Sequence, residues 1–468
     1  MTRWTVLLLL CIGLVAQAAD VKPARKGGSR QPVQSSKNNE VLPHPFDLIL
    51  SRPTATSVTV SVLCYADTEG NLAYGSQPGN LASQTPTRAF QKGEPVEIVL
   101  PGLQSDARYF YQFRSARAAS AELTFQTARP PGRPFKFTIT ADSHLDEHTD
   151  PLIYQRTLAN ARADAPDFHV DLGDTFMTEK HPNRTAAAQQ YLAQRYYFGQ
   201  LCETAPLFLA LGNHDGESPR GRGTDADNLA VWSNLMRKRY FPGPLPDTFY
   251  AGDATPHPAA GLLQDYYAWT WGDALFVVLD PFWFTSQQRG KGDNWSRTLG
   301  PEQYKWLKRT LETSKAKFKF VFIHHLVGGA GDQSRGGTEA ASLFEWGGKN
   351  ADGTDGFRQH RPGWSMPIHQ LLVQNRVSIV FHGHDHFYAK QDLDGIVYQE
   401  CPQPGYPGEG RPPRTAAEYG YVNGTILGSS GYLRVRVSPE STVVEYVRTS
   451  SASAAGGVVA HRYMVKPR

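Results

Sequence analysis

The stretch Phe381-His382-Gly383-His384-Asp385-His386 directly follows Val377-Ser378-Ile379-Val380, a short apolar run typical of a buried strand. Two histidines spaced i, i+2 just past a strand can face one point if the backbone turns sharply, and Gly383 allows such a turn because it has no Cβ. Neutral imidazole binds zinc, iron, nickel and copper. The stretch therefore predicts a metal site, with surface-loop histidines or a single structural metal as the alternatives.

Four other strand-like segments also end at side chains that can bind a metal. They are Phe135–Thr140 before Asp142-Ser143-His144, Phe168–Leu172 before Gly173-Asp174, Leu207–Leu211 before Gly212-Asn213-His214-Asp215, and Phe320–Ile323 before His324-His325. Each motif alone is common by chance, and Asn213-His214-Asp215 could equally cap a helix. In open α/β sheets, however, ligands bind outside the carboxyl ends of the strands. Five successive strand ends that carry metal-binding side chains therefore predict one shared site.

In this order, the motifs D-x-H, G-D, G-N-H-D, H and G-H-x-H resemble those of the calcineurin-like metallophosphoesterase superfamily, over about residues 135–400. The resemblance implies an α/β fold of four layers, αββα, in an enzyme that hydrolyses phosphate mono- or diesters at two metal ions. Met177 stands where purple acid phosphatases carry a tyrosine ligand, and His144 stands where their first motif has no histidine. We therefore expect the ordinary binuclear site rather than a tyrosinate–iron site.

The resemblance also assigns the metal ligands. It implies one metal held by Asp142, His144, Asp174 and His386, and a second held by Asp174, Asn213, His324 and His384, with Asp174 bridging. Two divalent ions roughly 3.5–4 Å apart need such an anionic bridge, and together they lower the pKa of a shared water whose hydroxide attacks phosphorus. The N and O donors favour two divalent or trivalent transition-metal ions, namely Fe, Zn or Mn.

The predicted catalytic residues lie beside these ligands. His214 resembles the family's general acid and anion stabiliser, and it is expected to contact the substrate together with Asn213. Asp215 could orient the His214 ring, or it could be a helix-capping carboxylate instead. Of the adjacent His324 and His325, we favour His324 as the ligand because it leaves the strand first. The histidines expected to be packing or surface residues are His148, His169 and His382.

The rest of the domain, predicted over residues 134–468, alternates helices and strands. The expected elements are helices over Ile153–Ala163, Gln303–Thr313 and Met366–Gln374, a strand over Leu275–Leu279, and an antiparallel pair over Tyr432–Val437 and Val443–Val447. Long loops over Gly216–Asp227, Asp280–Leu299 and Val327–Pro362 should border the site. We expect one of their arginines to contact the substrate phosphate and an aromatic ring to contact its organic part, although they could simply be solvated loops.

A smaller β-domain is predicted over residues 45–130, before the Pro/Gly-rich hinge. Ser57–Tyr65 and Pro95–Leu100 alternate as half-buried strands do. Within Pro101–Arg114, a leucine precedes a polar corner and Tyr109 enters the next strand, which resembles the tyrosine corner of immunoglobulin-like sandwiches. We expect a fibronectin type III-like β-sandwich, or another small β-domain, ahead of the phosphoesterase domain. That layout is similar to the layout of purple acid phosphatases.

The N-terminus predicts export, to the periplasm or outside the cell. Arg3, the apolar run Val6–Val15 and Ala16-Gln17-Ala18 form a signal peptide over residues 1–18, too short to span a bilayer comfortably. Residues 19–44 are a polar, flexible linker. No later segment is apolar enough to anchor the chain in a membrane. Three cysteines remain after cleavage, so at most one disulfide can form, and a Cys202–Cys401 bridge is one possibility.

Composition restricts the partners and the class of protein. The chain has 468 residues with 40% hydrophobic content, enough for two cores, and a net charge of only +4. The sequence has no basic block of the kind that nucleic-acid binding needs, so no nucleic-acid partner is expected. The resemblance implies a small-molecule phosphate ester as the substrate. Two other functions stay open. One is a non-enzymatic surface binding protein on a decayed phosphatase scaffold, and the other is a metal-dependent hydrolase of non-phosphorus esters or pyrophosphate links.

Overall fold

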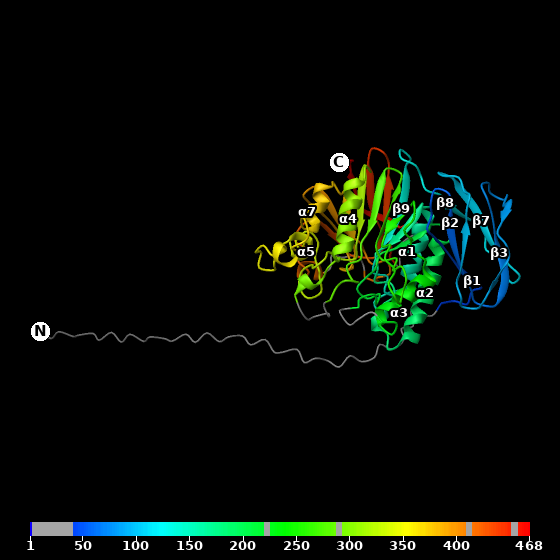
Figure 1. The fold of residues 1–468 in the computed structure, drawn as a ribbon, viewed down its shortest axis with the longest axis horizontal. Coiled ribbons are helices and arrows are strands. Elements are labelled where there is room, and N and C mark those ends of the chain that lie inside the picture. Colours follow the sequence, from blue (N-terminus) through cyan, green and yellow to red (C-terminus); the bar gives the residue numbers. More distant parts are fainter. Residues whose placement is uncertain (2–40, 220–224, 287–292, 409–413, 451–456) are drawn as a thin grey trace. The chain divides into compact units, whose positions relative to one another are not determined.

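Residues 46–126 form the all-β domain that the alternating pattern predicts (Figure 1). One sheet holds β1 (Phe46–Ser51), β2 (Val58–Cys64) and β6 (Val96–Leu100), and the other holds β3 (Thr68–Gly75), β4 (Ser83–Gln84), β5 (Arg88–Phe90), β7 (Arg108–Ser115) and β8 (Leu123–Gln126). All pairings within both sheets are antiparallel. The amide of Gln104 donates to Tyr109 Oη at 2.9 Å, which is the hydrogen bond of a tyrosine corner. The fibronectin type III assignment itself stays a prediction.

The computed structural model describes Met1 and residues 41–219, 225–286, 293–408, 414–450 and 457–468. The predicted signal peptide after Met1 and most of the predicted linker, up to residue 40, lie outside the described residues. So do Arg220 and Arg222 of the first predicted loop. All elements described below belong to one compact unit, Val33–Arg468.

The larger domain is built on two sheets. The first has the strand order β11-β10-β9-β20-β21-β22, and the second has the order β12-β13-β14-β15-β16-β18-β17-β19. The bounds are β9 Phe135–Thr140, β10 Phe168–Asp171, β11 Leu207–Leu209, β12 Ala251–Gly252, β13 Tyr267–Trp271, β14 Ala274–Val278, β15 Phe318–Phe322, β16 Ile379–His382, β17 Tyr388–Leu393, β18 Ile396–Glu400, β19 Thr425–Leu427, β20 Gly431–Val437, β21 Thr442–Arg448 and β22 Val458–Val465. β20 and β21 are the predicted antiparallel pair.

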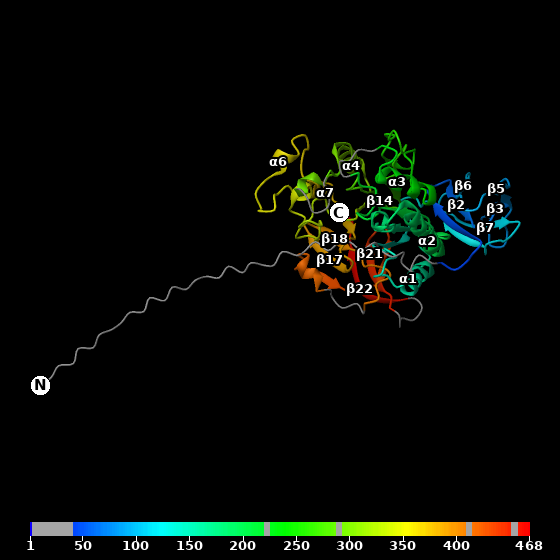
Figure 2. The same cartoon turned by 90° about the horizontal axis from the view of Figure 1, so that it is seen from below.

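Helices cover the outer face of each sheet, which gives the predicted four-layer αββα arrangement. Figure 1 shows α1 and α2 on one side of the sheets and α4 and α7 on the other, and both views place α3 beside α2 (Figure 2). The helices are α1 Pro151–Ala163, α2 Arg184–Cys202, α3 Leu229–Tyr240, α4 Pro301–Thr313, α5 Phe344–Gly347, α6 Phe357–His360, α7 Ile368–Gln374 and α8 Thr415–Glu418, with 3-10 turns η2 Thr178–Lys180 and η3 Asn294–Ser296. The predicted helices correspond to α1, α4 and α7 within two residues at each end.

Alternation along the strands decides which side chains fill which layer. Phe137 and Phe320 point between the two sheets, where an aromatic core forms. Tyr154 of α1 packs in a second core on the outer face of the first sheet, and Leu307 of α4 packs in a third on the outer face of the second. The N-terminus of α1 is fixed by Asp150, whose carboxylate accepts the Leu152 amide at 2.8 Å. Apolar packing therefore holds the two sheets face to face, together with hydrogen bonds such as the one from Tyr267 Oη of β13 to the Leu209 carbonyl of β11, at 2.8 Å.

The β-domain packs against α2 of the larger domain. Ile49 and Leu63 share a core with Phe198. Between them, the fully buried Arg195 donates to the backbone carbonyls of Ser61, at 3.0 Å, and Tyr240. The exact position of the domain boundary near the hinge stays a prediction.

The structure bears on the possible disulfide and on membrane-spanning helices. Cys202 and Cys401 are both buried free thiols, as is Cys64, so the possible Cys202–Cys401 disulfide does not form. Sequence spacing could not decide this because pairing depends on the distance and direction of the two Cβ atoms. Among the helices of the described residues, none combines the length and apolar character needed to cross a bilayer.

Candidate metal centre

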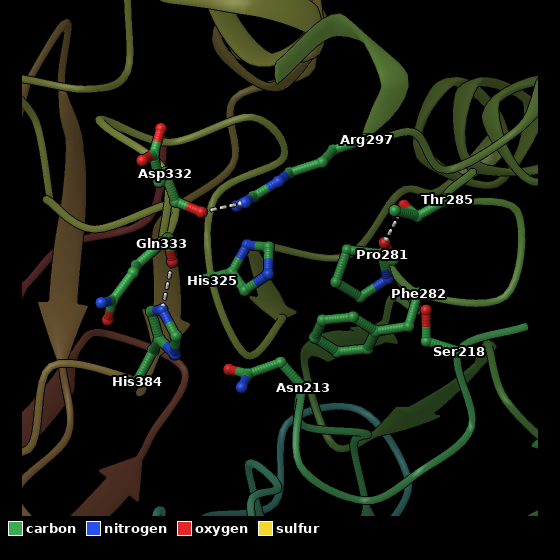
Figure 3. A pocket seen from close by; sticks show the side chains of 10 residues that line it. All are labelled: Asn213, Ser218, Pro281, Phe282, Thr285, Arg297, His325, Asp332, Gln333 and His384. Carbon is green, nitrogen blue, oxygen red and sulfur yellow. Dashed lines mark hydrogen bonds between the residues drawn. The ribbon is translucent and has the colours of Figure 1, made fainter. Parts of the chain in front are cut away.

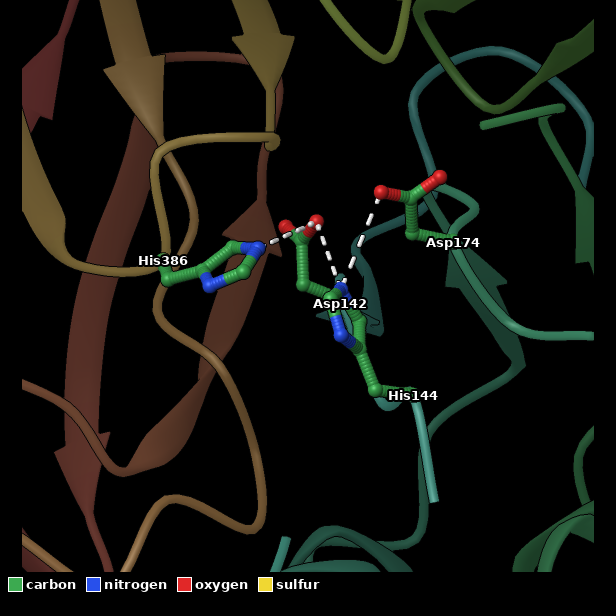
Figure 4. Close-up of side chains that lie close together, drawn as sticks. All are labelled: Asp142, His144, Asp174 and His386. Atoms are coloured by element: carbon green, nitrogen blue, oxygen red, sulfur yellow. Dashed lines mark ion pairs between the residues drawn. The ribbon is translucent and has the colours of Figure 1, made fainter. Parts of the chain in front are cut away.

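Five loops that follow parallel strands converge at one edge of the two sheets. β9, β10 and β11 run parallel in the first sheet, and β14, β15 and β16 run parallel in the second, so their carboxyl ends meet at common edges. The loops bring together two groups of side chains, Asp142, His144, Asp174 and His386 in one and Asp174, His324 and His384 in the other. Within each group the potential ligand atoms lie within 4.8 Å of one another. Figure 4 shows the first group.

In the first group, the imidazoles of His144 and His386 approach the carboxylates of Asp142 and Asp174. His144 Nε2 lies 3.7 Å from both Asp142 Oδ1 and Asp174 Oδ2. His386 Nε2 lies 3.4 Å from Asp142 Oδ1. These distances leave room for a cation among the four donors rather than for direct hydrogen bonds between all of them.

The second group shares Asp174 with the first. His324 Nε2 lies 3.3 Å from Asp174 Oδ2, 3.2 Å from Asn213 Oδ1 and 3.2 Å from His384 Nδ1. Asp174 Oδ2 therefore faces both groups, which is the position that a bridging carboxylate needs. Asn213 joins this group through its amide oxygen.

Two buried atoms of the cluster have no hydrogen-bond partner in the described structure, namely Asp142 Oδ1 and His144 Nε2. Asp142 is completely buried. A buried carboxylate oxygen without a donor is costly unless a cation satisfies it. The donor set, carboxylate and amide oxygens with imidazole nitrogens, fits transition-metal ions.

Outer hydrogen bonds fix the imidazole rings. His144 Nδ1 donates to Asp146 at 3.2 Å, and His324 Nδ1 donates to the Leu172 carbonyl at 2.9 Å. His384 is turned the other way, because its Nε2 donates to the Gln333 carbonyl at 2.7 Å and its Nδ1 faces the cluster. Such contacts set the tautomer and the direction of each ligand nitrogen.

Two glycines of the motifs are explained by the close approach of the ligand carboxylates. A Cβ on Gly383 would lie 2.7 Å from Asp142 Oδ2, and one on Gly212 would lie 2.3 Å from Asp174 Oδ1. Gly383 was expected to supply the turn through an unusual φ, but it is His384 that has a left-handed φ of 81°. Gly383 is required by the close approach of Asp142 instead.

Five of the seven predicted ligand residues have left-handed backbone conformations. The φ values are 58° at Asp142, 53° at His144, 54° at Asp174, 81° at His384 and 66° at His386. Non-glycine residues rarely adopt this region, and Asp, Asn and His do so most often. Backbone strain of this kind gathers at functional sites, where the surrounding structure enforces it.

The electrostatics of the cluster keep its carboxylates ionised. Burial alone would raise the pKa of Asp142 and Asp174, but the neighbouring histidines outweigh it and hold both below their usual range. Burial lowers the pKa of His144 and His324, yet the adjacent carboxylates raise both to about 9. Burial lowers the pKa of His384 and His386. The cluster thus balances anionic and cationic groups at short range.

His214 lies next to the cluster, but its ring belongs to neither ligand group. Its amide donates to Asp174 Oδ1 at 2.7 Å, and its Nδ1 donates to Glu179 of η2. Of the two roles considered for Asp215, the structure does not bear out that of orienting this ring. The Asp215 carboxylate instead accepts four backbone amides, those of Asp174, Thr175, Phe176 and Gly212, at 2.7–3.1 Å. Asp215 therefore shapes the Asp174 loop. This role resembles the helix-capping alternative, but the amides that it accepts belong to loops and not to a helix.

The other histidines take the places expected of them. His169 is buried between the hydroxyls of Thr138 and Thr140, and His382 lies 2.7 Å from Glu400. His148 has 69% of its side chain exposed. Burial, Arg297 and His324 lower the pKa of His325 to about 3, and its Nδ1 donates to the Leu326 carbonyl. The geometry agrees with the choice of His324 over its neighbour.

A pocket opens beside the second ligand group (Figure 3). Its lining residues are Asn213, Ser218, Pro281, Phe282, Thr285, Arg297, His325, Asp332, Gln333 and His384. Arg297 and Phe282 come from the Asp280–Leu299 loop, and Asp332 and Gln333 come from the Val327–Pro362 loop. Both loops therefore border the site, as expected of them.

Other residues of these loops are structural. Trp346 is fully buried and donates to Tyr398 Oη at 3.0 Å. Arg361 pairs with the buried Glu345 at 2.5 Å. Arg335 donates to the His384 carbonyl and, at 3.0 Å, to Asp385, so it holds the histidine-bearing loop in place.

Sequence reasoning missed Glu179, Arg297 and Gln333. Glu179 contacts a residue 35 positions away, and Gln333 acts through its backbone carbonyl. Neither contact leaves a local sequence signal. Arg297 lies within a loop that the sequence indicated, but that loop offers several polar residues and no spacing rule to choose among them.

A family model for calcineurin-like phosphoesterases matches residues 135–388, which is 254 of the 468 residues, and the chain belongs to that family. The protein is thus a metal-dependent phosphoesterase, and the resemblance noted in the sequence is confirmed. A comparison with curated proteins found no match.

Two solved structures share the fold. PhoD has a TM-score of 0.64 and 14% sequence identity, covering 92% of this chain and 91% of PhoD. A purple acid phosphatase, PPD1 from yellow lupin (Lupinus luteus) seeds, has a TM-score of 0.60 and 15% identity, covering 90% of this chain and 74% of PPD1. At such identities the similarity concerns the fold and leaves substrates open.

Proposed function

We propose that the protein hydrolyses phosphate mono- or diesters at two transition-metal ions and that it is exported from the cytoplasm. The observation that carries the first part is the position of Asp174 Oδ2. This atom lies 3.7 Å from His144 Nε2 in one ligand group and 3.3 Å from His324 Nε2 in the other. A single carboxylate oxygen shared by two sets of donors supports a binuclear site over a single structural metal.

The chain's own residues fit two ions. Asp142, His144, Asp174 and His386 would hold one, and Asp174, Asn213, His324 and His384 would hold the other. Fe, Zn or Mn suits these donors. When bound, such a pair supplies a nucleophilic water and neutralises charge on the phosphoryl group.

His214 is the proposed proton donor to the leaving oxygen of the ester. The Glu179 carboxylate accepts its Nδ1–H, which fixes the ring and leaves Nε2 for the substrate. The His214 amide is bonded to Asp174, so the ring is tied to the same loop system as the bridging carboxylate. Asn213, which lines the pocket, is the second proposed substrate contact.

A chromogenic panel tests the reaction. We expect the protein to hydrolyse 4-nitrophenyl phosphate or bis(4-nitrophenyl) phosphate, to lose this activity with a chelator, and to regain it with Mn, Zn or Fe. Elemental analysis of protein purified without chelator should find close to two transition-metal ions per chain. A metal content of zero would contradict the binuclear site. Hydrolysis of a carboxylic ester, with both phosphate esters untouched, would favour the hydrolase of non-phosphorus esters instead.

The case for export rests on the N-terminal sequence, which lies outside the described residues. A basic Arg3, the apolar run Val6–Val15 and the Ala16-Gln17-Ala18 site support a cleaved signal peptide. We expect the mature protein, recovered outside the cytoplasm, to begin at Ala19. An intact N-terminus in a cytoplasmic fraction would contradict export. Mass spectrometry of the N-terminal peptide after cell fractionation distinguishes the two outcomes.

A further inference from the structure

The pocket beside the metal centre ends at an arginine. We propose that this pocket receives the organic part of a phosphate ester carrying a second anionic group, a carboxylate or another phosphate, and that Arg297 binds this group. The inference rests on the proposed function, because it assigns a substrate class to the same site. It concerns a part of the substrate that does not react.

The inner end of the pocket belongs to the second ligand group. Asn213 and His384 line it, whereas the ligands specific to the first group, Asp142, His144 and His386, are not among its lining residues. The pocket therefore extends away from one side of the cluster only. An ester held at the cluster can place one substituent there.

The middle of the pocket suits an organic group. Phe282 presents its ring, whose centroid lies 5.1 Å from that of His325 and 6.1 Å from that of His324. The wall is fixed, because Asp280 accepts the Phe282 amide at 2.8 Å and Thr285 Oγ1 donates to the Pro281 carbonyl at 2.7 Å. The apolar surface of Pro281 and Phe282, held in place in this way, favours contact with a carbon skeleton.

The far end carries the charge. Arg297 is only 8% exposed, and its Nη2 donates to the backbone carbonyl of Asp332. Its own backbone is held by Asn294, whose carbonyl accepts the Arg297 amide at 3.2 Å. In Figure 3 the Asp332 carboxylate points away from the pocket. A guanidinium held in this way places a fixed positive charge at the pocket, and such a charge attracts a carboxylate or a phosphate.

The alternative is that Arg297 contacts the phosphoryl group that reacts. Figure 3 shows Arg297 and Asn213 at opposite ends of the pocket, with His325 between them. Because Asn213 belongs to the cluster and Arg297 lies across the pocket from it, a second, distal anion is the better match. The two roles give different kinetics.

The test uses two matched substrates, 4-nitrophenyl phosphate and 3-carboxy-4-nitrophenyl phosphate, which differ by one carboxylate. We expect the wild-type protein to prefer the carboxylated ester. Arg297→Gln should lower kcat/KM for that ester by about 10-fold or more, mainly through KM, and should change it by less than about twofold for 4-nitrophenyl phosphate, which lacks the carboxylate. Arg297→Lys should retain part of the preference because a point charge remains.

Controls separate the possible failures. Arg309→Gln removes an exposed charge from α4 and should leave both rates unchanged. Circular dichroism and metal content check that each variant is folded, and Arg297→Lys decides the matter if Arg297→Gln does not fold. An equal loss on both esters, or no loss on either, would overturn the subsite while leaving the proposed reaction intact. A wild-type protein inactive on every phosphate ester would overturn the proposed reaction and the subsite with it.

Discussion

Replacement of Asp174 by asparagine is expected to remove at least one bound metal ion and to lower kcat by about 10³-fold or more. Asp174 Oδ2 is the atom that faces both ligand groups, and a neutral amide cannot bridge two cations as a carboxylate does. The amide oxygen can still accept the His214 amide in place of Oδ1, so the loop itself should keep its shape. The loss should therefore appear in metal content and rate rather than in folding.

Elemental analysis, kcat and Tm measured on the same preparation check this expectation. Asp164→Asn is a matched control, since Asp164 also forms short hydrogen bonds, to Tyr432 and Arg434, but lies outside both ligand groups. That variant should keep its metals and its rate. If Asp174→Asn retained two ions per chain and a near-wild-type kcat, the bridging assignment would be wrong.

His214→Ala should keep the metals and lose hydrolysis of esters with poor leaving groups, by about 10²–10⁴-fold. An alkoxide leaves only with a proton, whereas 4-nitrophenolate leaves without one, so the loss on 4-nitrophenyl phosphate should be much smaller. Metal content should be unchanged because the His214 side chain is in neither ligand group. Rates on an alkyl and an aryl phosphate, compared in one buffer, measure the difference.

Glu179→Gln provides a milder version of the same test. It removes the charge that holds His214 Nδ1 while keeping a hydrogen-bond acceptor. We expect a loss of about 10-fold that again falls mainly on the alkyl ester. Wild-type rates on alkyl esters in His214→Ala would refute the proton-donor role. Equal losses on alkyl and aryl esters would point to anion stabilisation instead.

The sequence was sufficient to predict the gathering of the ligands because the rule behind it is topological. Parallel strands of one sheet end at a common edge, so side chains just after β9 and β10 gather at one edge and those just after β15 and β16 at another. The αββα fold that the resemblance implies brings these two edges together. The ligand sets implied by the resemblance match the two groups in the structure, with Asn213 added through its contact with His324. The αββα layers follow from the same alternation of strands and helices.

Contacts made by loops could not be predicted in this way. Glu179, rather than Asp215, reaches His214 because η2 folds back over the site, and nothing in its local sequence indicates that path. Arg335 and Gln333 come from one loop, yet one holds the backbone of His384 and the other holds its ring. Such roles depend on where a long loop crosses the site, which spacing along the chain does not encode.

The left-handed backbone at five of the ligand residues limits how this enzyme can change its metal over evolutionary time. Aspartate and histidine tolerate that conformation, whereas a β-branched or bulky side chain at the same place would be a genuine outlier. Replacing any of these five ligands by a β-branched or bulky residue is therefore disfavoured, whereas exchange among Asp, Asn and His is compatible with the backbone. The groups that orient the ligand imidazoles are Asp146 and the carbonyls of Leu172 and Gln333. Substitutions around these groups can adjust the site to a different ion while the metal ligands themselves are kept.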